Sequence, residues 1–299
     1  MTGHRPQSGV HALRRGLVPF AASLACLVAG CGSSETATPA RATTAAPTVQ
    51  ATTTPPATLP FADGREVDTE AFFAALRAEL PTLEASAAVR DDWARLRKAH
   101  DLADDPALYA DFVRVRLAFE ATRAGGLWGL EWRITDQEPR SDRVWAQWRD
   151  APPSDRLPLH TAIAECDELS ALFAVVAHGL GLSPRSRTGL FWPTANHTVA
   201  VWAFPGAGGR EIRVVVPTSQ IFLDGEQGLD TRAFDPWTQP RLYDYRGQDA
   251  AKFRLPAPLA RQFVAEARRS GTLSGGALQA LRNRREYDQR VAASAGREH

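Results

Sequence analysis

The chain has 299 residues, with 35 Lys and Arg against 34 Asp and Glu. Three of the basic residues and none of the acidic ones lie in residues 1–30, which leaves 32 basic and 34 acidic side chains in the rest. This near balance excludes a general electrostatic attraction to nucleic acid, so we expect no nucleic-acid partner.

Residues 1–30 have the pattern of an export signal. Two arginines precede the apolar run Leu17 to Val28, which is too short to be a permanent membrane span. The run ends in Leu27-Val28-Ala29-Gly30-Cys31, which resembles the lipobox of bacterial lipoproteins. The resemblance implies cleavage before Cys31, a diacylglycerol on its sulfur and a membrane anchor in the bacterial cell envelope, at the outer membrane or periplasmic face. An ordinary secretory signal cut elsewhere is the alternative.

Residues 31–60 consist mainly of Thr, Ala, Pro and Ser with almost no large apolar residue, so they predict a disordered linker. Residues 61–158 form the helical N-terminal part of the globular domain, because apolar residues recur at helical spacing between Thr69 and Arg123. Asp105-Pro106 is a suitable helix start. Trp128, Trp132, Trp145 and Trp148 then indicate an aromatic core, with a ligand platform as the alternative.

Residues 159–255 predict the central fold. Asp167 to Gly179 has the apolar stripe of a helix, and Arg185–Trp192, His197–Phe204 and Glu211–Val216 are rich in strand-forming residues. One helix packed on a small antiparallel sheet is an α+β core. Residues 256–299 then add C-terminal helices.

Cys166 is the only cysteine left once the leader is removed and Cys31 is acylated, since the third cysteine, Cys26, lies in the leader. It has no partner for an intramolecular disulfide. The start of a helix favours a thiolate, and a nearby imidazole can accept the thiol proton. His197 opens the second strand, which makes Cys166 and His197 the candidate nucleophile and base. Glu165, Asp167 and Glu168 oppose this assignment, because negative charges near the sulfur raise the pKa of a thiol.

These residues resemble the transglutaminase-like superfamily, which has a papain-like cysteine fold. The resemblance rests on three motifs in chain order. They are Cys166-Asp-Glu-Leu-Ser with Gly181-Leu-Ser-Pro-Arg185, then His197-Thr-Val-Ala-Val-Trp202, and then Val214-Val-Val-Pro-Thr218. The resemblance implies cysteine-dependent acyl transfer or amide hydrolysis on a peptide or protein substrate, for example a cell-wall peptide.

The third motif departs from the family pattern. Val216 stands where the family has the aspartate that orients the imidazole, and valine cannot do so. Gln220 is the preferred substitute because its amide oxygen can accept from a ring N–H, and Thr218 and Asp224 are further possibilities. A catalytically inactive binding or scaffold lipoprotein is therefore the alternative function. A thiol redox sensor is a third, which would need a resolving cysteine from another protein.

Other chemistry has no support in the sequence. There is no Gly-rich phosphate loop, no His-Glu-x-x-His motif and no pair of cysteines with metal-ligand spacing. We therefore expect no cofactor and no metal.

Overall fold

A computed structural model describes residues 61, 65–135, 138–154, 156–219, 228–245, 253–273, 280, 284 and 288. The leader, the linker with Cys31, and the candidates Gln220 and Asp224 lie outside the described residues. So does most of the last expected helix.

The described part of the chain is α+β, as the sequence predicts. Its helices are α1 (Thr69–Ala85), α2 (Ala87–His100), α3 (Pro106–Thr122), α4 (Ser141–Arg149), α5 (Cys166–Gly179) and α6 (Ala257–Thr272). Its strands are β1 (Glu66–Asp68), β2 (Leu130–Trp132), β3 (Ala162–Ala164), β4 (Arg187–Thr194), β5 (His197–Pro205), β6 (Glu211–Val216) and β7 (Arg254–Pro256). The 3-10 turn Ala207–Gly209 joins β5 to β6.

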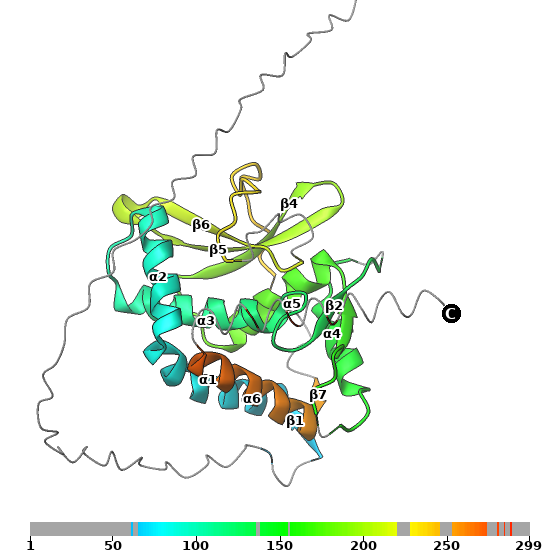
Figure 1. Cartoon of the computed structure of the whole chain (residues 1–299). Helices are drawn as coiled ribbons and strands as arrows, with labels where there is room; N and C mark the ends of the chain where they lie inside the picture. The colour runs from blue at the N-terminus through cyan, green and yellow to red at the C-terminus, as the bar shows by residue number, and fades with distance from the viewer. Residues whose placement is uncertain are drawn as a thin grey trace, which may run out of the picture. The chain divides into compact units, whose positions relative to one another are not determined.

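The main sheet has the antiparallel order β4-β5-β6 (Figure 1). Helix α5 packs on β5 and β4, α3 packs on α5, and α1 packs on α3 and α6. Two short strand pairs were not expected from the sequence. β1 pairs with β7 antiparallel, and β2 pairs with β3 parallel.

Alternate residues of β5 belong to different cores, because successive side chains of a strand point to opposite faces. Ala200, Trp202 and Phe204 join the main core with α5. Val199, Val201 and Ala203 join a smaller cluster on the other face, where Phe234 and Leu242 pack.

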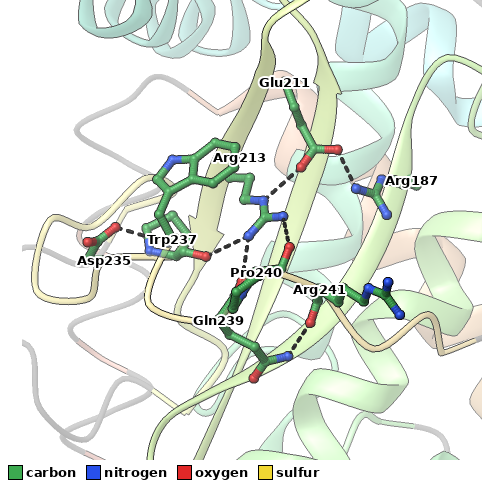
Figure 2. A network of polar contacts seen from close by, with 9 residues as sticks. Arg187, Glu211, Arg213, Asp235, Trp237, Gln239, Pro240 and Arg241 are labelled. Atoms are coloured by element: carbon green, nitrogen blue, oxygen red, sulfur yellow. Dashed lines mark hydrogen bonds and ion pairs between the residues drawn. The ribbon is translucent and has the colours of Figure 1, made fainter.

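The segment 228–245 covers this second face, and Arg213 of β6 holds it there (Figure 2). The Arg213 guanidinium donates to the carbonyl oxygens of Pro236 at 2.9 Å and of Gln239 and Pro240 at 2.8 Å. Its Nε donates to Glu211 at 2.8 Å, and the Trp237 ring lies 4.0 Å from its central carbon. One buried side chain thus fastens a loop to the sheet.

The tryptophans fill the core between α1, α4 and α6, which confirms the packing prediction for three of the four. Trp128, Trp145 and Trp148 are fully buried, and Trp128 stacks on Phe263 with ring centroids 4.7 Å apart. Trp132 is only half-buried.

Candidate active site

Helix α5 begins at Cys166, and a capping box of two glutamates fixes this start. The Glu165 carboxylate accepts from the backbone N–H of Glu168, and Glu168 Oε2 accepts from the backbone N–H of Glu165 at 3.1 Å. The same two carboxylates accept from the backbone N–H of Thr135 at 2.8 Å and from its hydroxyl at 3.1 Å. Acidic side chains suit the positive end of a helix, so the sequence places the beginning of α5 securely.

The Cys166 side chain is buried, with 9% of its surface exposed. The backbone N–H groups of Thr198 and Asp167 favour the thiolate and act to lower the pKa of the thiol. Burial acts in the opposite direction and is the largest effect, and the charges of Asp167 and Glu165 add to it. The net result is that the pKa of the Cys166 thiol is raised, so the thiol is protonated at neutral pH.

The acidic residues around the sulfur are themselves perturbed. Burial, followed by the charge of Glu165, raises the pKa of Asp167 to about 7. Burial also raises the pKa of Glu168. The sequence left open whether these acids face the sulfur. In the structure, the charges of Asp167 and Glu165 act on the thiol and raise its pKa.

His197 is the first residue of β5 and is 4% exposed. Burial lowers the pKa of His197, so its ring is neutral at pH 7. The ring lies on the sheet face covered by segment 228–245, against Phe234, with centroids 5.3 Å apart.

Helix α5, which begins at Cys166, packs on β5, and the Ser170 hydroxyl donates to the Thr198 carbonyl at 3.4 Å. The start of α5 therefore lies beside the start of β5. The His197 ring, however, lies against Phe234 on the face of β5 opposite to the one on which α5 packs. The catalytic pairing of the two side chains stays a prediction.

The position where the family pattern has an aspartate to orient the imidazole holds no acid in this chain. Val216 pairs with Ala200 and is fully buried in the main core. Thr218, two residues later, contacts α5: its hydroxyl lies 2.9 Å from the Ser170 hydroxyl. Ser170 also donates to the Thr198 carbonyl at 3.4 Å. Ser170 and Thr218 thus join α5 to the start of β5 and to the residues just after β6.

Several residues of this site were not expected from the sequence. Ser170 follows Cys166 by about one helical turn, so helical spacing could have indicated that both face β5. Phe234 and Thr135 approach from distant loops, and no local pattern points to them.

Two further searches of the described residues bear on the site. They include no group of three or more His, Cys, Asp or Glu side chains that could hold a metal ion. None of the helices found in that same part of the chain has the length and apolar character needed to cross a membrane.

Comparison of the chain with protein-family models, curated proteins and solved structures found no match.

Proposed function

We propose that this chain is a bacterial envelope lipoprotein whose transglutaminase-like domain transfers acyl groups from peptide or protein amides to water or an amine. The observation that supports the proposal best is the packing of α5 on β5, with the Ser170 hydroxyl donating to the Thr198 carbonyl at 3.4 Å. It brings the lone thiol of the globular part to the strand that His197 opens, at the first residue of a helix.

The reaction starts from neutral partners, because the pKa of Cys166 is raised and the pKa of His197 is lowered. For the reaction the His197 imidazole has to turn from Phe234 toward the sulfur, where it removes the thiol proton as the sulfur attacks the amide carbonyl carbon. The proton then passes to the leaving amine as the C–N bond breaks, which leaves a thioester on Cys166. Water or a second amine attacks the thioester, gives its proton to His197 and releases the thiol.

Two backbone N–H groups near the thiol support this chemistry. The Thr198 and Asp167 backbones are fixed by β5 and α5, and they offset part of the cost of forming a thiolate in a buried place. Such fixed donors stabilise negative charge without having to reorient during the reaction.

A fluorescent-amine incorporation assay tests the activity, with casein and isolated cell-wall peptides as amide donors. We expect the Cys166→Ala protein to be inactive and a Ser33→Ala protein, changed only in the expected linker, to keep full activity. A Cys166→Ala protein that retains the wild-type rate refutes the mechanism. The pH profile adds a second check. Burial lowers the pKa of His197, so the imidazole stays neutral below pH 6.5 and kcat/KM should begin to fall only at a lower pH.

The anchor is tested separately. Acylation of Cys31 would tether the protein stably, since each buried methylene contributes about 0.8 kcal/mol. A Cys31→Ser protein should therefore leave the membrane fraction, and one that stays there contradicts the anchor.

The second candidate is a non-catalytic binding or scaffold domain with the same fold. It is favoured by Val216 being buried in the core at the third position and by the raised pKa of the Cys166 thiol. The amine-incorporation assay separates the two, because a scaffold gives no Cys166-dependent product with either amide donor.

A further inference from the structure

We infer that the domain has a second site, a cavity between α2, α3 and residues 228–232 that binds a small organic carboxylate. The cavity has a volume of about 500 Å³. This falls within the range of about 300–1,000 Å³ that is usual for small-molecule sites. Cys166 and His197 are not among its lining residues, so the inference is independent of the proposed function.

Arg116, in the middle of α3, lines the cavity and carries the argument. It is 2% exposed, and its Nε donates to Asp92 at 2.5 Å. Both terminal nitrogens are buried and have no acceptor within the described part of the chain. Buried donors without partners cost free energy, and a carboxylate offers two oxygens in the geometry of the guanidinium fork.

The charges of the lining favour a singly charged ligand. Its carboxylates belong to Asp92, Glu120 and Asp230. Each one already has a partner: Asp230 lies 2.7 Å from His100, Glu120 lies 3.3 Å from Arg123, and Asp92 is shared by Arg116 and Arg95. The lining also carries Arg95, Arg116 and Arg232, so its charges balance, and a singly charged ligand disturbs this balance less than a phosphate dianion does.

The rest of the lining favours an apolar body on the ligand. Leu96, Phe112, Phe119 and Leu229 contribute hydrocarbon surface to the cavity. A ligand with one carboxylate and an aromatic or aliphatic group therefore fits both the buried guanidinium and the apolar wall.

Calorimetric titration of the full chain with 3-phenylpropionate tests the inference, with 3-phenylpropionamide and inorganic phosphate as comparison probes. We expect saturable binding of the carboxylate with a dissociation constant of about 1 mM or below, and weaker binding of both other probes. Arg116→Met should weaken carboxylate binding by about tenfold to a hundredfold, because two charge-assisted hydrogen bonds are lost. Arg90→Met, an exposed arginine of α2 outside the lining, is the matched control and should bind as the wild type does.

Three results would overturn the inference: no saturable carboxylate binding, equal binding of the amide or phosphate, or unchanged binding by Arg116→Met. If Arg116→Met does not fold, Ala99→Trp decides. Ala99 is an exposed lining residue of α2, two helical turns after Asp92, and an indole there takes up space in the cavity while leaving the Arg116–Asp92 pair unmutated. Carboxylate binding that survives this change also overturns the inference.

Discussion

Replacing Asp167 by asparagine should make the protein more stable at alkaline pH. Burial and the charge of Glu165 raise the pKa of Asp167 from an ordinary 3.8 to about 7 in the folded protein. Ionised Asp167 is therefore costly in the folded state and not in the unfolded state. Asparagine keeps an oxygen that can accept from the Glu168 N–H, as Asp167 Oδ1 does at 2.9 Å, and its amide can donate to Glu165 as the protonated acid does.

The magnitude follows from the pKa difference. Below pH 3.8 both states carry a protonated acid, so Asp167 makes no difference to the free energy of unfolding. Between pH 3.8 and about 7 the unfolded state loses its proton first, and the folded state is destabilised progressively. At about 1.4 kcal/mol per pKa unit, the full effect above pH 7 is roughly 2 to 4 kcal/mol, the lower figure allowing for relaxation around a buried charge.

Urea denaturation at pH 4, 6 and 8 measures this effect. The variant should match the wild type at pH 4 and exceed it increasingly up to pH 8. Asp91→Asn, at an exposed position of α2, is the control and should change stability by less than about 0.5 kcal/mol at every pH. A difference between Asp167→Asn and wild type that is the same at pH 4 and pH 8 refutes the assignment of a buried, neutralised carboxyl.

One reactivity measurement and two substitutions test separate features. Cys166 should react with iodoacetamide more slowly at pH 7 than a free cysteine, because burial raises the pKa of its thiol; rapid alkylation below pH 7 would contradict this. Gly179→Ala should lower stability by about 1–3 kcal/mol in thermal or urea denaturation, since a Cβ there would meet the Phe73 ring at 2.5 Å, and an unchanged midpoint would argue against this close approach. Arg213→Met should cost about 2–4 kcal/mol and speed proteolysis of segment 228–245, whereas Arg210→Met, at an exposed position, should do neither.

Long segments with a clear period were predictable from the sequence, and short ones were not. The sequence placed a helix over Asp167–Gly179 and strands over His197–Phe204 and Glu211–Val216, because each carries enough apolar or strand-forming residues to set its own conformation. The structure begins the helix one residue earlier and ends the first of these strands one residue later.

The pairs β1–β7 and β2–β3 escaped prediction for a physical reason. Each strand has three residues, which is too few to show a period of two. β1 gains its hydrogen bonds from β7, a strand almost two hundred residues later in the chain. Such a strand exists because tertiary packing brings its partner there, so no local window of sequence contains the signal.

The candidate site was only partly predictable for the same reason. Residue types and motif order indicated Cys166 and His197. The environment of the thiol depends on how the start of α5 lies against Thr198, which is a tertiary contact. Phe234 reaches His197 only because segment 228–245 is fastened to the other face of the sheet.

The start of α5 shows why a cysteine at a helix N-terminus need not be a thiolate. The unpaired N–H groups of a first helical turn can stabilise only a limited amount of negative charge, and here the capping box of Glu165 and Glu168 already uses part of it. Cys166 receives the Asp167 N–H and gains a second donor from Thr198, yet burial and the neighbouring carboxylates outweigh both. Chemistry at this sulfur therefore requires a base that removes its proton during attack, and so the proposed activity depends on the His197 imidazole more than on the helix.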